Sequence, residues 1–125
     1  MLPKSQRLSR GFSVIFQKGA KISTPFFVLR AVAAWDNAPR FAVTVSKKVS
    51  KKAVVRNRIR RRLFAAARKA GFPEHPKKRC RIICIGNASA YDASFSEIVA
   101  HMKSVFLRLE QHSFSLKKEG KQNRY

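Results

Sequence analysis

The sequence predicts an α+β fold in which helices pack on a small β-sheet. Three segments with strand character, residues 26–35, 40–46 and 79–86, alternate with helical patterns along the chain. The helical pattern between the second and third of these segments must connect two strands across the sheet.

The composition indicates a folded domain that binds polyanions. The chain has 28 Lys and Arg residues against 6 Asp and Glu, a formal net charge of +22. With 45% hydrophobic residues it is not a disordered basic tail, and a charge of this size attracts phosphate backbones. The sequence shows no apolar run long enough for a bilayer and no secretory signal pattern. We therefore expect a cytoplasmic protein that does not bind membranes.

The domain organisation is expected to be simple. No internal repeat or shift in composition divides the 125 residues, and a chain of this length can bury roughly two thirds of its unfolded surface. We predict a single domain over residues 1–125, in which 1–7 and 116–125 are disordered basic ends.

A first helix is expected from Ser9 to a stop at Gly19, because Phe12, Ile15 and Phe16 follow helical i, i+3, i+4 spacing. Phe12 and Phe16 then lie one turn apart on one side. From residue type alone, a place in the core is the simpler interpretation of both rings.

The first two predicted strands have informative alternation. Residues 26–35 are apolar on both faces, with Phe26, Val28, Arg30 and Val32 sharing one of them. After a turn signal at 36–39, residues 40–46 are expected to return as the antiparallel hairpin partner. In this second strand bulky residues alternate with the small or hydroxylic residues Ala42, Thr44 and Ser46. A face of small groups either leaves room for an extended ligand backbone or is simply open to water.

The central helix concentrates the positive charge. Ser50 is its predicted N-cap, and Gly71 with Pro73 ends it. At 100° per residue its apolar stripe faces the core, and the polar surface carries Asn57, Arg60, Arg61, Phe64 and Arg68, with Arg58, Arg62 and Lys69 on one flank. Acidic i, i+4 partners are absent, so these cations repel one another. A solvated basic face is the ordinary interpretation of a charge run, but the missing acids favour a nucleic-acid surface.

The last strand and helix have structural signals. Cys80 and Cys84 lie four apart in the strand over 79–86, too far for a disulfide, and are expected to be reduced core residues. Ser94 and Glu97 fit a capping box. The helix that follows has Ile98, Met102, Val105 and Leu109 as its buried stripe, with Phe106 beside it.

The sequence predicts no catalytic and no metal-binding residues in this chain. The six acids are spread over loops, the last helix and the tail, so no carboxylate pair is available for a two-metal nuclease. The three histidines, His75, His101 and His112, are scattered, and no glycine-rich phosphate loop is present. Any chemistry must therefore come from a partner.

The stretch VSKKVSKKAVVRNRIRRRL resembles the signature of the bacterial ribonuclease P protein component, an Arg-Asn-Arg helix after a Val-Ser-Lys-Lys strand end. The resemblance continues in FSVIFQKGAKISTPFFVLRAV, in RFAVTVSKK and in RCRIICIGNASAYDASFSEIVAHMKSVFLRL. It covers the chain from about Leu8 to Leu109.

The resemblance implies a two-layer α/β sandwich with a small mixed sheet and a left-handed βαβ crossover. It also implies a ribonuclease P subunit that binds a catalytic RNA and the single-stranded 5′ leader of precursor tRNA. The holoenzyme is then an endonuclease that removes the leader to give the mature tRNA 5′ end. Its active site is in the RNA, which chiefly binds the required Mg²⁺.

Site residues follow by position and by pattern. The expected RNA-binding residues are Lys47, Lys48, Lys51, Lys52, Arg56, Asn57, Arg58, Arg60, Arg61, Phe64 and Arg68. The expected leader cleft consists of Phe12, Phe16, Val28, Arg30, Thr44 and Ser46. Arg30 replaces an aromatic residue found in some members of the family. Phe64 stands where many have a basic residue, and its helical angle predicts that it touches RNA.

A non-catalytic RNA-binding or ribosome-associated basic protein is the competing interpretation, and it explains the charge and the helix equally well. A DNA-binding helix would need a second helix in a helix-turn-helix motif, and the strands on either side of the basic helix argue against DNA as the ligand. The sequence does not specify the leader's preferred bases or the free-state oligomer.

Overall fold

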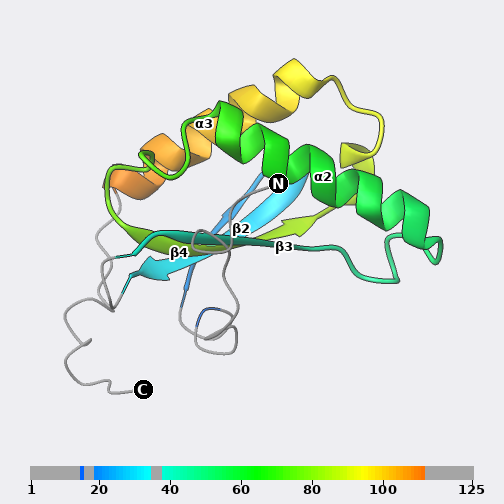
Figure 1. Ribbon diagram of the computed structural model, residues 1–125, viewed down its shortest axis with the longest axis horizontal. Helices are drawn as coiled ribbons and strands as arrows, with labels where there is room; N and C mark the ends of the chain where they lie inside the picture. The colour runs from blue at the N-terminus through cyan, green and yellow to red at the C-terminus, as the bar shows by residue number, and fades with distance from the viewer. Residues whose placement is uncertain (1–14, 16–18, 35–37, 112–125) are drawn as a thin grey trace.

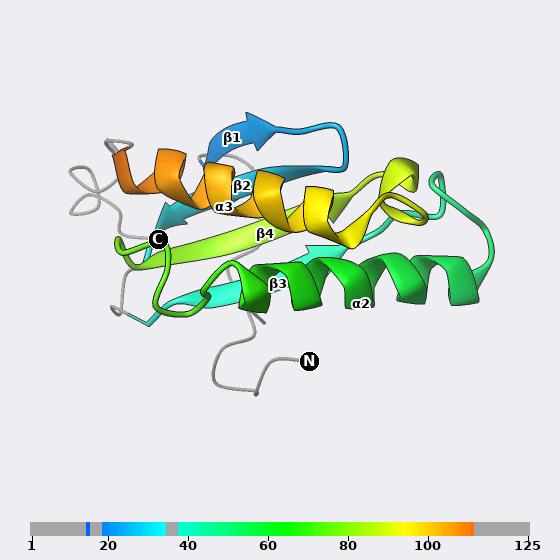
Figure 2. The ribbon, with the colours of Figure 1, turned by 90° about the horizontal axis from the view of Figure 1, so that it is seen from above.

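A four-stranded sheet carries two long helices side by side on one face (Figure 1, Figure 2). The computed structural model describes residues 15, 19–34 and 38–111. In chain order the elements are β1 (Ala20–Ser23), β2 (Phe27–Ala33), β3 (Arg40–Thr44), α2 (Ala53–Lys69), β4 (Cys80–Gly86), the 3₁₀ turn η2 (Ala88–Ala90) and α3 (Phe95–Gln111). The predicted α+β class is confirmed. The predicted disordered ends and the rings of Phe12 and Phe16 lie outside the described residues.

The strand order is β1-β2-β4-β3, which corrects the predicted hairpin. The segment from Arg40 does not pair with β2; it runs parallel to β4, with Phe41 opposite Ile82. β2 pairs antiparallel with β1 on one side and with β4 on the other. The physical reason is burial: six of the seven β4 residues are buried, so the strand belongs in the centre of the sheet, between β2 and β3.

The β3–α2–β4 connection is left-handed, as the resemblance implies. Seen from the helix side in Figure 2, β3 and β4 both run toward the right, and α2 returns toward the left in front of them. When the strands are turned to point upward, β4 lies to the left of β3. Most such crossovers are right-handed.

The main core lies between the sheet and the two helices. Phe27, Leu29 and Ala31, which share one face of β2, point into it. The apolar stripes of both helices are confirmed as buried: Ile59, Leu63, Ala66 and Ala67 on α2, and Ile98, Met102, Val105, Phe106 and Leu109 on α3. Gly86 allows α2 to approach closely, because a Cβ there would lie 2.9 Å from Ile59 Cγ2 and 3.0 Å from Leu63 Cδ1.

The helix ends test three predictions: the N-cap at Ser50 is wrong, the stop at Gly71 is confirmed, and the capping box at Ser94 and Glu97 is confirmed for the bond to the Ser94 hydroxyl. Ser50 is not the N-cap of α2: the helix begins after Lys52 without a side-chain cap, and Ser50 Oγ instead accepts the Lys52 N–H at 3.1 Å. Gly71, with φ of 113°, ends the helix in a Schellman motif, in which the Phe72 N–H donates to the Ala67 carbonyl at 3.0 Å. Ser94 Oγ accepts the Glu97 N–H at 3.4 Å at the start of α3.

Candidate RNA-binding surface

The outer side of α2 is a row of cations without carboxylate partners. Asn57, Arg61 and Arg68 are exposed, while Arg56 and Arg60 are half-buried. No acidic residue lies in the first turn of the helix, and within the described ranges no α2 cation forms an ion pair. The repulsion among these residues is therefore left for an external polyanion to relieve.

Two arginines on the outer side of α2, Arg56 and Arg60, are oriented by polar contacts with nearby residues. Arg60 Nη1 donates to Asn57 Oδ1 at 2.6 Å, and Arg56 Nη1 donates to the Ser50 carbonyl at 2.9 Å. Each of these bonds uses only part of a guanidinium group, which carries five N–H donors. The remaining donors suit bidentate contacts with phosphate.

The four predicted lysines gather in the loop between β3 and α2. Lys47, Lys48, Lys51 and Lys52 are all exposed. The loop is shaped by a turn in which the Val49 N–H donates to the Ser46 carbonyl at 3.0 Å. It brings the lysines to the N-terminal end of α2, where the helix dipole is also positive. The lysine loop and the outer side of α2 therefore form one basic surface.

Phe64 does not belong to this surface, and its predicted contact with RNA is wrong. Its side chain is only 6% exposed and packs edge-to-face on Phe41 of β3, with ring centroids 5.8 Å apart. The angle around α2 was misleading because the apolar contact of this helix extends down over the edge strand β3. A large ring can reach that strand from the margin of the stripe.

The flank of α2 formed by Arg58 and Arg62 faces the loop before α3. Arg58 Nε donates to the Tyr91 carbonyl at 3.0 Å, and Arg62 Nη2 donates to the Ala93 carbonyl. The guanidinium carbon of Arg58 also lies 5.0 Å from the centroid of the Tyr91 ring. Sequence reasoning missed Tyr91, since its distance of 33 residues from Arg58 gives no local signal.

The predicted cleft residues Val28, Arg30 and Thr44 lie on the sheet face that points away from the helices. In register, Val28, Ile85 and Thr44 form one cross-strand row. Arg30, Ile83 and Ala42 form the next. Four of these residues are half-buried: Val28, Arg30, Ala42 and Thr44. Ser46, two residues after Thr44, is exposed. The structure thus brings Val28, Arg30 and Thr44 together on one face, with the half-buried Ile85 between Val28 and Thr44, which the sequence did not single out.

A small apolar cluster lies on one part of this face. Ile15 packs against Val32 and Ile83, and all three are buried. Arg30 Nη2 donates to the Gly19 carbonyl at 3.3 Å, which holds the side chain beside β1. Since Phe12 and Phe16 lie outside the described residues, their place in the cleft stays a prediction.

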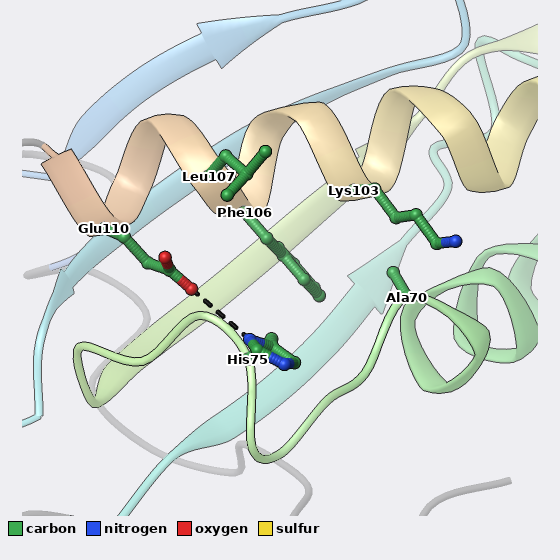
Figure 3. Close-up of a pocket in the computed structure, with 6 residues that line it drawn as sticks. All are labelled: Ala70, His75, Lys103, Phe106, Leu107 and Glu110. Atoms are coloured by element: carbon green, nitrogen blue, oxygen red, sulfur yellow. Dashed lines mark hydrogen bonds and ion pairs between the residues drawn. The ribbon is translucent and has the colours of Figure 1, made fainter.

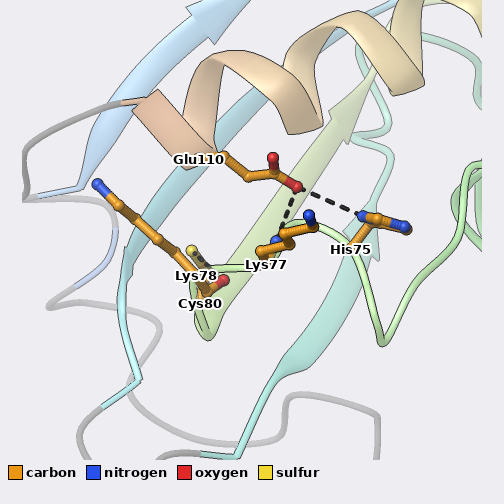
Figure 4. A network of polar contacts seen from close by, with 5 residues as sticks. All are labelled: His75, Lys77, Lys78, Cys80 and Glu110. Atoms are coloured by element: carbon orange, nitrogen blue, oxygen red, sulfur yellow. Dashed lines mark hydrogen bonds and ion pairs between the residues drawn. The ribbon is translucent and has the colours of Figure 1, made fainter.

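Among the described acids and histidines, Glu110 and His75 form a polar contact, at the end of α3. Glu110 Oε2 accepts the Lys77 N–H at 2.8 Å and lies 3.4 Å from His75 Nδ1 (Figure 4). The Lys77 N–H, and secondarily His75, lowers the pKa of Glu110. These contacts tie the loop before β4 to α3, and the nearby bond from Cys80 Sγ to the Lys78 carbonyl, at 3.3 Å, belongs to the same loop.

A hollow of about 270 Å³ lies beside this group, between α3 and the end of α2 (Figure 3). It is lined by Ala70, His75, Lys103, Phe106, Leu107 and Glu110. One carboxylate and one imidazole that serve to anchor a loop do not make a hydrolytic site. Over the described ranges no three His, Cys, Asp or Glu side chains are grouped as metal ligands.

Two further predictions can be compared with the structure. Cys80 and Cys84 are both buried thiols, as expected, and burial raises the pKa of the Cys84 thiol. None of the described helices has the length and apolar character needed to cross a membrane.

Comparisons with known proteins bear on the family and the fold of this chain. The ribonuclease P family model matches residues 2–110. The ribonuclease P protein component of Gluconacetobacter diazotrophicus is 34% identical over 82% of this chain and 90% of its own. The component of Synechococcus elongatus is 44% identical over 71 residues, and there the match spans only 58% of the relative's length.

Solved structures show the same architecture. The ribonuclease P protein of Staphylococcus aureus superposes with a TM-score of 0.65 at 25% identity, over 85% of this chain and 95% of that one. The protein of Thermotoga maritima has a TM-score of 0.70 at 20% identity, over 86% and 97%, and supports the fold alone. Because the family model covers most of the chain and a relative above 30% identity aligns over most of both sequences, this chain belongs to the ribonuclease P protein family.

Proposed function

We propose that this chain is the protein subunit of ribonuclease P. It binds the catalytic RNA through the lysine loop and the outer side of α2. It also holds the single-stranded 5′ leader of precursor tRNA on the sheet face opposite the helices. The holoenzyme then cuts the precursor once to give the mature 5′ end.

The observation that carries the proposal is the arrangement around the end of β3. Thr44 belongs to the open sheet face, Ser46 follows it, and the exposed Lys47 and Lys48 come next, leading to the cations of α2. One continuous stretch of chain thus joins the two surfaces. A leader on the sheet and a catalytic RNA on α2 would meet at this strand end.

Each surface suits its proposed ligand. The cations of α2 and its loop would neutralise phosphates and release counterions, so binding should depend strongly on salt. The sheet face offers the half-buried Ile85 in a row with Val28 and Thr44, with Arg30 and Lys21 paired in register at one side. Single-stranded nucleic acid lies well on such a basic and apolar groove with little sequence preference.

The chemistry is assigned to the RNA partner. The described acids do not group as metal ligands, so these residues do not fit a Mg²⁺ site, and we assign Mg²⁺ binding chiefly to the RNA. The contribution of this chain is then to bind and orient two RNAs and to neutralise their charge. On this proposal it acts in the cytoplasm, where tRNA precursors are transcribed in bacteria.

The test is reconstitution with a transcribed bacterial ribonuclease P RNA and a precursor tRNA. The purified protein alone should not cut the precursor. Together with the RNA it should give a single 5′ cut at a lower Mg²⁺ concentration than the RNA needs by itself. Cutting by RNA-free protein, or no effect of the protein on the RNA's cleavage, would contradict the proposal, and the second result would favour a plain RNA-binding protein.

A further inference from the structure

The loop between β4 and α3, residues 87–94, lies beside the N-terminal half of α2 (Figure 1, Figure 2). Arg58 binds it through the Tyr91 carbonyl, at 3.0 Å, and Arg62 through the Ala93 carbonyl. The guanidinium of Arg58 also lies 5.0 Å from the centroid of the Tyr91 ring. The same arginine therefore fixes both the backbone and the ring of Tyr91.

The other side of the loop is anchored to the start of β2. Ser89 Oγ donates to the Pro25 carbonyl at 2.6 Å, and the Asn87 N–H donates to the Phe26 carbonyl at 3.0 Å. Ala90, next to Tyr91, is fully buried. Because the loop is held from both sides, Tyr91 is presented on a rigid support, and a ligand that stacks on it would lose little further conformational freedom.

Tyr91 remains available to a ligand. Its side chain is 39% exposed, and among the described residues Arg58 is its only ring partner. The bond to the Tyr91 carbonyl uses the Nε–H of Arg58, which leaves the Nη donors for a phosphate. An aromatic ring beside a fixed guanidinium matches the two parts of a nucleotide, its base and its phosphate.

The surroundings favour a polyanion over a protein partner. Arg58 and Arg62 flank the loop, and the cations of α2 continue beyond them. The loop itself has a single acid, Asp92. An apolar protein surface would gain little here, since Tyr91 is the one large hydrophobic side chain of the loop that is exposed.

We propose that Tyr91 and Arg58 form a nucleotide-binding pair, in which Tyr91 stacks on an unpaired base of the catalytic RNA and Arg58 holds an adjacent phosphate. The pair extends the basic surface of α2 onto the loop 87–94. This inference rests on the proposed function, since it names a further contact of the same RNA-binding surface.

The experiment measures binding of a transcribed bacterial ribonuclease P RNA by Tyr91→Leu and Tyr91→Phe across a range of salt concentrations. Tyr91→Leu should bind roughly 5- to 150-fold more weakly, as expected for the loss of one base stack. Its log–log salt slope should equal that of the wild type, because no charge is removed. Tyr91→Phe keeps the ring and should bind like the wild type. Leu107→Ala, an exposed apolar position on α3 (57% exposed), is the matched control and should also bind normally.

Three results would overturn the pair. The first is normal binding by Tyr91→Leu, and the second is an equal loss of binding in Tyr91→Phe. The third is that poly-glutamate, and not single-stranded RNA, competes with the catalytic RNA for the binding that depends on Tyr91.

If Tyr91→Leu lowers the unfolding midpoint, a variant with the photo-crosslinking residue benzoylphenylalanine at position 91 replaces it. Crosslinks to discrete nucleotides then support the pair, and their absence contradicts it. If the wild type itself neither binds nor activates the RNA, the proposed function fails and the inference falls with it. If the wild type binds and activates the RNA and the Tyr91 variants bind it equally well, the pair is overturned but the proposed function stands.

Discussion

Phe64 of α2 meets Phe41 of β3 edge-to-face, with 5.8 Å between the ring centroids. The ring centroid of Phe41 also lies 5.4 Å from that of Phe72, a residue just beyond the end of α2. The helix that carries the proposed RNA-binding cations is thus fastened to the sheet's edge strand by aromatic packing. Packing against the core fixes the position of the helix, and its exposed cations are the groups proposed to bind RNA.

Phe64→Ala should therefore destabilise the fold and leave RNA binding by the folded protein unchanged. Removing a buried phenylalanine costs about 3–5 kcal/mol in free energy of unfolding. Urea denaturation measures the loss, and RNA titration well below the unfolding midpoint measures binding. Phe64→Leu is the control and should lose less stability. A stable Phe64→Ala protein with weakened RNA binding would return this ring to the RNA-binding surface.

Arg61→Ala should show the opposite behaviour. Arg61 is exposed on the outer side of α2 and has no carboxylate partner among the described residues. Its loss should weaken binding of the catalytic RNA and reduce the log–log salt slope by up to about one unit. The unfolding midpoint should stay the same or rise, because repulsion along the helix is relieved.

Arg108→Ala on α3 is the control for Arg61→Ala, since it removes one exposed cation from the other helix. It should leave the salt slope close to that of the wild type. Equal changes in slope for the two variants would mean that the protein's total charge, and not a defined surface on α2, determines binding.

Glu110 should make stability depend on pH in the acid range. Its carboxylate accepts the Lys77 N–H, and the folded state lowers its pKa below the ordinary value of 4.5. A lowered pKa means that the stabilisation is fully present above the unfolded-state pKa and is lost as pH falls through the folded one. Glu110→Gln should thus be less stable than the wild type at pH 7, and the difference should shrink toward pH 3.

Urea denaturation at both pH values tests this, and Glu74→Gln, an exposed acid of the same loop, is the control. The Glu74 variant should show a smaller change with pH. A Glu110→Gln deficit that is equally large at pH 3 would mean that packing, not the ionised carboxylate, holds the loop on α3.

Much of the fold followed from local patterns. The periodicity of α3, the Gly71 stop and the alternation of β2 are set by neighbouring residues, so the sequence alone predicts them. The wrong strand partner of β3 and the misplaced Phe64 are nonlocal failures, whereas the wrong N-cap at Ser50 is a local one. β3 pairs with β4 rather than β2 because α2 returns the chain to a central strand in which six of the seven residues are buried, and a turn signal cannot reveal such a crossover.

The candidate site was predictable to the same extent. The lysine loop and the α2 arginines are contiguous in sequence, and the structure gathers them as expected. Phe64 was misplaced because a helical angle does not show how far a neighbouring strand extends beneath the helix. Tyr91 was missed because its partner, Arg58, is 33 residues away.

The central claim is that one chain binds the catalytic RNA on α2 and the leader on the opposite face of the sheet. Thr44→Phe tests it most directly, because Thr44 lies in one cross-strand row with Val28 and Ile85 on the face opposite the helices. Phenylalanine is well tolerated in strands, and its large side chain would occupy the space proposed for the leader. Ser104→Phe, at an exposed position of α3, is the matched control. Both variants are first shown to fold and to form saturated holoenzyme.

The measurement is the ratio of the holoenzyme's affinities for precursor tRNA and for mature tRNA. The wild type and Ser104→Phe should prefer the precursor, since only the precursor has a leader to contact the sheet. Thr44→Phe should lose most of that preference through weaker precursor binding, with affinity for mature tRNA and for the catalytic RNA unchanged. An undiminished preference in assembled Thr44→Phe holoenzyme would contradict the account, because the leader would then bind elsewhere.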